Sequence, residues 1–251
     1  MLKIFRQIRY NLMSENKTGR YIKYAIGEIF LVVIGILIAL QINNWNQDRL
    51  TNKRSRDYLI SLVEDIKSDI KQYNNNIGSY RFDIAKNSRL FTSDYKTLEI
   101  DSITQLVLTF YMPNKTTRQT YEKIKNSGLA ESLGSEVINK AINDYYNIEL
   151  VYYEGLLQWD KEYNDEYYKF WFYNNNYESS SIRGYSSSKL PFLDNAEKRK
   201  NDLINLIEST QGRNLLRGGI ERHEHTLVKV DELKSYAENL VEMINKELST
   251  L

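Results

Sequence analysis

The only two histidines of the chain, His223 and His225, lie beside Glu221 in the sequence GIERHEH. Imidazole and carboxylate groups are the ligands and bases of metal-dependent hydrolases. A zinc-protease helix needs histidines at i and i+4, whereas these two stand at i and i+2 and therefore lie on different faces of a helix. We predict a solvated helix face with no bound metal. Of the functions that we consider for this protein, a membrane-anchored hydrolase that uses Glu221, His223 and His225 is the least favoured.

A second stretch with chemical potential is WDKEYNDEYYKFWF, residues 159–172, which mixes four acids with aromatic rings. Paired carboxylates among aromatic rings are typical of sugar-binding and glycosidase clefts. On a helix, the same spacing also suits a core in which the rings pack inward and the acids face water, and we favour this interpretation. If the stretch does bind a ligand or partner, the surface consists of Trp159, Tyr163, Tyr167 and Trp171.

Composition excludes several other kinds of chemistry. The chain has no cysteine, which rules out disulfides, thiolate nucleophiles and Cys-ligated metals. It also lacks a glycine-rich phosphate loop and a nucleophile elbow, so we expect no enzyme and no cofactor. Residues 1–23 carry a net charge of +5 and the remainder −4. Because the body is acidic, we expect no nucleic-acid partner.

The elements that position these residues begin with an apolar segment, AIGEIFLVVIGILIALQI, at residues 25–42. As a helix it rises about 27 Å, close to the thickness of the hydrocarbon core of a bilayer. Tyr24 and Trp45 stand where aromatic residues anchor a span at the two interfaces. We predict a transmembrane helix over 24–45 rather than a buried core helix. No Ala-x-Ala-like site follows the segment, which favours an uncleaved anchor over a signal peptide.

The charges that flank this span predict its orientation. Six bases precede it within residues 1–23, a short amphipathic stretch suited to the inner leaflet. The bases that follow the span are fewer and are largely offset by acids. The positive-inside rule therefore places residues 1–23 in the cytoplasm and residues 46–251 in the periplasm, as a single-pass protein of the inner membrane.

Within the span, small residues recur on one side of the helix. Gly27, Gly35 and Ala39 lie on one stripe with Leu31, and Glu28 lies beside it. Small residues let helix backbones approach closely, so the stripe fits self-association or contact with a membrane partner. The alternative is that glycine is simply common in transmembrane helices and that Glu28 reaches the lipid headgroups.

Beyond Trp45 the sequence predicts helices throughout. Apolar residues recur at the 4-3-4-3 spacing of a heptad seam, which predicts one helix over 47–91 and a possible site of homo-oligomerisation. The seam consists of Leu59, Val63, Ile66, Ile70, Tyr73, Ile77, Tyr80 and Ile84. Further helices are predicted from Ser102 to before Pro113 with Phe110 inside, over Thr117–Lys125, from Ser135 toward Phe172, from Asp194 through Ile207, and around Leu227–Leu248, with a loop over Asn174–Leu190. No strand alternation is convincing, so the fold class is all-α, an extramembrane helical bundle behind one transmembrane helix.

Two segments carry a family resemblance. The sequence FRQIRYNLMSENKTGRYIKYAIGEIFLVVIGILIALQINNWN resembles the N-terminal signature of an uncharacterised family of short membrane proteins from Bacteroidota-type bacteria. The sequence TYEKIKNSGLAESLGSEVINKAINDYY, residues 120–146, is similar to the mid-chain motif of that family. The resemblance is strong over residues 1–60 and fair over 117–150. It implies location and architecture only, and it supplies no catalytic residues.

The sequence therefore predicts a membrane-anchored interaction or scaffold protein that presents a helical bundle outside the cytoplasm. Its expected partners are the lipid bilayer, further copies of itself and an unidentified membrane or periplasmic protein. The alternative is a periplasmic ligand-sensing domain that passes a signal through its transmembrane helix to a membrane partner.

Overall fold

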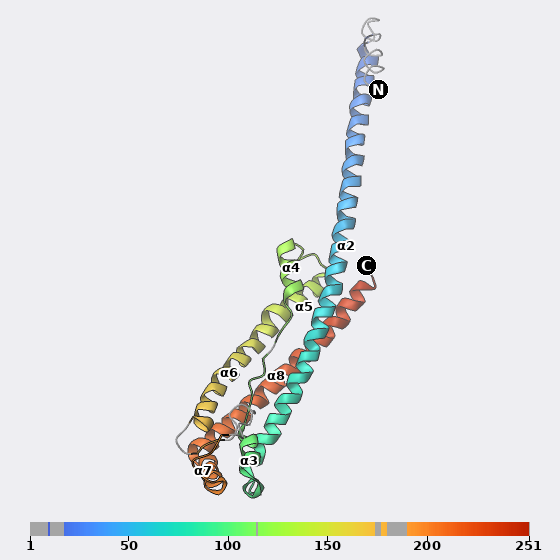
Figure 1. The fold of residues 1–251 in the computed structure, drawn as a ribbon. Helices are drawn as coiled ribbons and strands as arrows, with labels where there is room; N and C mark the ends of the chain where they lie inside the picture. The colour runs from blue at the N-terminus through green and yellow to red at the C-terminus, as the bar shows by residue number, and fades with distance from the viewer. Residues whose placement is uncertain (1–9, 11–17, 114, 174–176, 180–189, 251) are drawn as a thin grey trace. The chain divides into compact units, whose positions relative to one another are not determined.

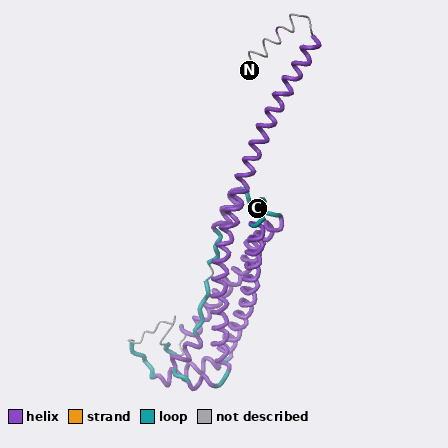
Figure 2. The backbone as a smooth tube through the Cα atoms, turned by 90° about the vertical axis from the view of Figure 1, so that its right-hand side faces the viewer, coloured by secondary structure: helices purple, strands orange, loops and turns teal. Residues whose placement is uncertain are grey.

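The structure, a computed structural model, describes residues 10, 18–113, 115–173, 177–179 and 190–250. Within these ranges every regular element is a helix, which confirms the predicted all-α class (Figure 2). The helices are α2 (Thr18–Ser88), α3 (Ile100–Val107), α4 (Gln119–Ser127), α5 (Glu136–Asp144), α6 (Leu150–Phe172), α7 (Ala196–Glu208) and α8 (Thr210–Leu248). Short 3-10 helices occupy Arg89–Phe91 and Asp94–Thr97, and one π turn, Tyr145–Glu149, joins α5 to α6.

The chain divides into two compact units, Met1–Ser55 and Arg56–Leu251. In the first unit the described residues form the N-terminal part of α2. It contains an 18-residue window with a mean hydropathy of 2.5, none of which is buried by the rest of the chain. This helix is long and apolar enough to cross a membrane, although a signal sequence has the same properties. Most of the predicted segment 1–23, and the side chain of Tyr24, lie outside the described residues.

The second unit contains two hydrophobic cores. The first combines the heptad seam of α2 with side chains of α4, α5, α6 and α8. The second joins α3, the C-terminal part of α6, α7 and the start of α8. Helices α6 and α8 lie side by side (Figure 1). Because the seam is covered within the chain, its buried residues are not available to pair with another copy.

Several predicted helix boundaries differ from those observed. The helix expected to begin at Ser102 begins at Ile100, because Ile100 is itself buried in the second core. Phe110 lies beyond the end of that helix and is 42% exposed. Helix α4 begins at Gln119, two residues later than predicted, and ends before Gly128, whose φ of 74° suits the glycine predicted to stop it. The predicted loop over 174–190 lies mostly outside the described residues.

The corner between α7 and α8 depends on glycine at Gly212. The backbone N–H of Gly212 donates to Oγ of Ser209 at 3.0 Å, which caps the start of α8. A Cβ atom at this position would lie 2.1 Å from the carbonyl oxygen of Leu206. Helix α7 can therefore turn directly into α8 only because residue 212 has no side chain.

Candidate functional site

The four aromatic residues proposed as a binding surface do not form one. Tyr167 and Trp171 are buried in the second core, at 1% and 0% exposure. Tyr163 is partly buried, whereas Trp159 is 49% exposed. Tyr167 and Trp171 present no surface to a ligand, because they lie on the face of α6 that packs into the second core. The favoured interpretation, in which the rings pack in a core, therefore holds for Tyr167 and Trp171.

The histidine segment also differs from its prediction. His225 and Glu221 are exposed on α8, as a solvated face requires, but His223 is only 2% exposed. The three residues therefore form no common site, and their placement does not support the hydrolase alternative. Among the described residues, no group of three or more His, Asp or Glu side chains is placed to hold a metal ion.

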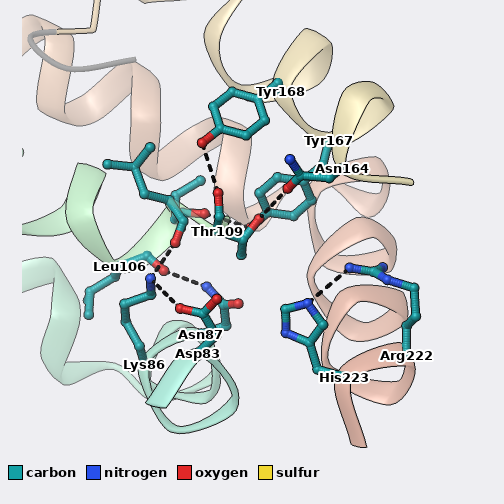
Figure 3. Close-up of polar contacts among 12 residues, drawn as sticks. Asp83, Lys86, Asn87, Leu106, Thr109, Asn164, Tyr167, Tyr168, Arg222 and His223 are labelled. Atoms are coloured by element: carbon teal, nitrogen blue, oxygen red, sulfur yellow. Dashed lines mark hydrogen bonds and ion pairs between the residues drawn. The ribbon is translucent and has the colours of Figure 1, made fainter. Parts of the chain in front are cut away.

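His223 belongs instead to a buried ionic cluster between α6 and α8. Oδ1 of Asp160 accepts a hydrogen bond from Nε of Arg222 at 2.6 Å, and it lies 3.3 Å from Nε2 of His223. The guanidinium of Arg222 stacks on the ring of Tyr163 at 3.8 Å and contacts His223 (Figure 3). On the other side, the ring of Tyr80 meets His223 edge-on, with the ring centroids 5.2 Å apart. The prediction that the acids of residues 159–172 face water is thus wrong for Asp160.

The charge state of this cluster follows from its contacts. Burial by itself raises the pKa of Asp160, but the hydrogen bond from His223 and the charge of Arg222 outweigh it and leave the pKa below its usual value. Asp160 is therefore ionised at neutral pH and neutralises Arg222. One oxygen of Asp160, one terminal nitrogen of Arg222 and Nδ1 of His223 are buried without a hydrogen-bond partner among the described residues.

The arrangement has limited catalytic potential. A carboxylate that orients a histidine is half of a nucleophilic triad, but the second imidazole nitrogen must then activate a nucleophile that a substrate can reach. Here Nδ1 of His223 is buried and meets no hydroxyl of the described residues. The ion pair of Asp160 and Arg222 instead joins α6 to α8 across 62 residues of sequence.

Sequence reasoning missed a row of buried polar side chains on α2. Asp69, Asn76 and Asp83 are each at most 3% exposed and recur every seven residues beside the apolar seam. The amide of Asn76 donates to the hydroxyl of Tyr153 on α6 at 3.0 Å, and Asp83 pairs with Lys86 at 2.8 Å. A polar residue at a fixed heptad position was the signal that would have revealed this row.

An extended segment crosses between α2 and α6. We call residues 108–118 the strap; residue 114 lies outside the described residues. Its first end is held by side chains on both flanking helices (Figure 3). Lys86 donates to the carbonyl of Leu108, Tyr168 donates to that of Thr109 at 2.8 Å, and the Thr109 hydroxyl donates to Asn164 at 3.0 Å. These bonds satisfy a backbone that has no strand partner in the described structure.

A groove lies beside the strap, on a face of α6 next to the one that enters the core, and Tyr168 contacts both. Its volume is about 620 Å³, within the range of small-molecule sites. Its walls combine aromatic rings with two ammonium groups and one carboxylate. The lining residues are Phe110, Tyr111, Lys161, Asn164, Asp165, Tyr168, Lys169 and Tyr173.

The small residues of the apolar helix are open to their surroundings. A Cβ atom added at Gly27 or Gly35 would meet no atom of the chain within 4 Å. Ala39 and the anchor residue Trp45 are exposed, and Glu28 is partly exposed. No part of the described chain therefore covers this stripe.

The described residues thus offer an uncovered apolar helix, a buried ionic cluster and an aromatic groove beside the strap. Only the first and the last of these are accessible to a partner or ligand. Comparison of the chain with protein-family models, with curated proteins and with solved structures finds no match in any of the three.

Proposed function

We propose that this protein is a single-pass membrane protein whose role is interaction, with α2 as its anchor and residues 46–251 as a helical bundle outside the cytoplasm. The observation that carries the proposal is the 18-residue apolar window, of which no part is buried by the rest of the chain. In water such a surface is unstable, because large contiguous apolar areas are rare on soluble monomers. In the hydrocarbon core of a membrane the same exposed apolar surface is not destabilising.

The N-terminal charge supports the inner-membrane orientation. Residues 1–23 carry a net charge of +5, which favours retention on the cytoplasmic side and export of the body. The resemblance to the Bacteroidota-type membrane family supports the same location. In this proposal the protein acts through association with a partner in the membrane or outside the cytoplasm.

The association surface in this proposal is the stripe of Gly27, Gly35 and Ala39. A helix partner would pack closest at Gly35, where the backbone is open. We expect Gly35→Leu to abolish crosslinking of the full-length protein, to itself or to its membrane partner. The measurement is crosslinking in intact membranes followed by mass spectrometry. The matched control is Val33→Leu, which enlarges a neighbouring side chain away from the stripe. Unchanged crosslinking in Gly35→Leu contradicts an interface at this stripe.

A second candidate function, ligand sensing, is favoured by the groove beside the strap. Phe110 and Tyr173 are 42% and 62% exposed and can stack on a ring, while Lys161 and Lys169 can pair with a carboxylate. Against the carboxylate of Asp165 the two ammonium groups leave a net charge of +1, and this chemistry fits a ring-bearing anion such as a sugar acid. The groove replaces the aromatic set proposed from the sequence, since it uses an adjoining face of α6.

This second function predicts that an acidic oligosaccharide binds and a neutral one does not. Calorimetric titration of the full-length protein in detergent with oligogalacturonate should show saturable binding, absent with a neutral galactose oligomer of equal length. Lys161→Gln with Lys169→Gln should weaken it at least tenfold, because each lost charge-assisted hydrogen bond contributes about 1.5 kcal/mol or more. The double variant Lys140→Gln with Lys234→Gln, away from the groove, is the control. Equal affinity for both sugars would contradict the prediction.

A further inference from the structure

The two ends of the strap are held by different chemistry. At the first end the acceptors are backbone carbonyls, and the donors are the ammonium of Lys86 and the hydroxyl of Tyr168. At the second end Arg118 donates to Glu154 and to the carbonyl of Tyr146, and the acceptors of the backbone N–H groups are carboxylates of α2. Oδ1 of Asp69 accepts the backbone N–H of Thr117 at 2.9 Å, and Oδ2 of Asp65 accepts that of Thr120 at 3.3 Å. At the second end a carboxylate binds the backbone of the strap directly, whereas at the first end the carboxylate of Asp83 contacts the strap only through Lys86.

Asp69 has an unusual environment for a carboxylate. It is 1% exposed, and none of the described Lys, Arg or His side chains forms an ion pair with it. The nearest guanidinium along the strap, Arg118, is bonded to Glu154 and to the carbonyl of Tyr146. The titratable and charged groups around Asp69 and its partners are Asp65 and Tyr73 on α2, Arg118 on the strap, Tyr121 on α4, Tyr145 and Tyr146 in the π turn, Glu154 on α6 and Tyr236 on α8.

The hydrogen bonds around Asp69 accommodate a protonated carboxyl as well as an ionised one. When Asp69 is ionised, its Oδ2 accepts from the hydroxyl of Tyr145 at 3.1 Å. That hydroxyl also lies 2.9 Å from the hydroxyl of Tyr73, and either can donate. A proton on Oδ2 of Asp69 can therefore donate to Tyr145, which then donates to Tyr73, while Oδ1 keeps its bond to Thr117. In the ionised state each of these groups has a partner; in the protonated state the carboxyl keeps all of its bonds, and the hydroxyl hydrogen of Tyr73 gives up Tyr145 as its acceptor.

We propose that protonation of Asp69 holds the Thr117 end of the strap against α2, so that acidification closes the strap and neutral pH loosens it. Opening this end would expose Asp69 to water, where a carboxylate is well solvated. In the closed strap the same charge is buried beside Asp65 without a cation. The closed state therefore favours the neutral carboxyl, and the open state favours the ionised one.

The sign and the pH range follow from linkage. Burial raises the pKa of Asp69 from 3.8 to about 6, against the lowering effect of its bonds to Thr117 and Tyr145 and with a small contribution from Asp65. Between these two values the closed strap binds a proton that the open one does not. Closure is therefore strongest below about pH 4 and is weakened as the pH rises through 6. Between pH 7.5 and 5.0 the opening constant falls about tenfold.

Hydrogen exchange of the full-length protein in detergent tests this directly. After correction for intrinsic rates, we expect the amide of Thr117 to be protected about tenfold more at pH 5.0 than at pH 7.5. The midpoint should lie near pH 6, the raised pKa of Asp69. The amide of Thr117 should also exchange faster than that of Leu240 in the first core, because the opening is local.

Two isosteric variants complete the test. Asp69→Asn is always neutral and should keep Thr117 protected to the same extent at both pH values. Asp57→Asn, an exposed carboxylate on the same helix, should retain the tenfold response. A pH response that survives in Asp69→Asn overturns the proposal, as does a wild-type response of opposite sign. Equal protection of Thr117 and Leu240 would show global unfolding instead of strap opening and would overturn it as well.

Discussion

Replacing Arg222 by methionine is expected to lower the free energy of unfolding by about 3–5 kcal/mol, because it leaves Asp160 as an uncompensated buried charge. Asp160 and Arg222 are 1% and 2% exposed, and their bond is 2.6 Å long. Methionine preserves much of the side-chain volume, so the loss reports the charge and not a cavity. Urea unfolding of the full-length protein in mild detergent, followed by circular dichroism, measures the change.

Two further variants make this result specific. Arg217→Met removes an exposed arginine from the same helix and should cost less than about 0.5 kcal/mol. Asp160→Asn combined with Arg222→Met removes both charges and should recover part of the stability lost in the single variant, since the two residues are coupled. If Arg222→Met is as harmless as Arg217→Met, the ion pair does not hold α6 against α8.

The second large effect concerns the apolar helix. Placing lysine at both Val33 and Leu37, in the middle of the predicted span, should prevent stable insertion. Each charge at the centre of a membrane helix costs about 2.5–3.5 kcal/mol on the insertion scale. We expect the double variant to move from the carbonate-resistant membrane pellet to the soluble or degraded fraction, whereas the unaltered protein stays in the pellet.

The control places the same charges outside the span. Gln47→Lys with Leu50→Lys should leave the protein in the pellet, because both positions follow Trp45 and lie in or beyond the interface. A tag fused ahead of Met1 distinguishes an anchor from a signal sequence, since cleavage would remove it from the mature protein. Membrane retention of the double lysine variant, or loss of the tag, would contradict an uncleaved single-pass anchor.

The apolar helix and the helical class were predictable because both depend on local patterns. Eighteen consecutive residues of high hydropathy indicate a long apolar helix whatever the rest of the chain does. The 4-3-4-3 spacing from Leu59 to Tyr80 identified the face of α2 that the structure buries, whereas Ile84, the last residue of the predicted seam, lies outside both cores. Gly128 marked the end of α4, because its positive φ is a property of a single residue.

Helix starts were predicted less well, because capping residues compete with tertiary contacts. Ser102 was expected to begin a helix that instead begins at Ile100, where burial in the second core contributes more than a cap. The strap was expected to be partly helical near Phe110. It is extended because side chains of α2 and α6 take up its carbonyl groups, and these helices are distant in sequence.

The sequence by itself determined the location signals of this protein: a basic first segment, an apolar helix and an acidic helical body. These follow from charge and hydropathy, which act residue by residue. Only the tertiary structure decided which side chains meet. It placed Tyr167 and Trp171 inward and Tyr168 and Tyr173 on a groove, because one residue of offset changes the face of a helix by about 100°. It also joined Asp160 to Arg222, 62 residues apart, and Asp69 to Thr117, 48 residues apart, since such pairs form only when separate helices pack together.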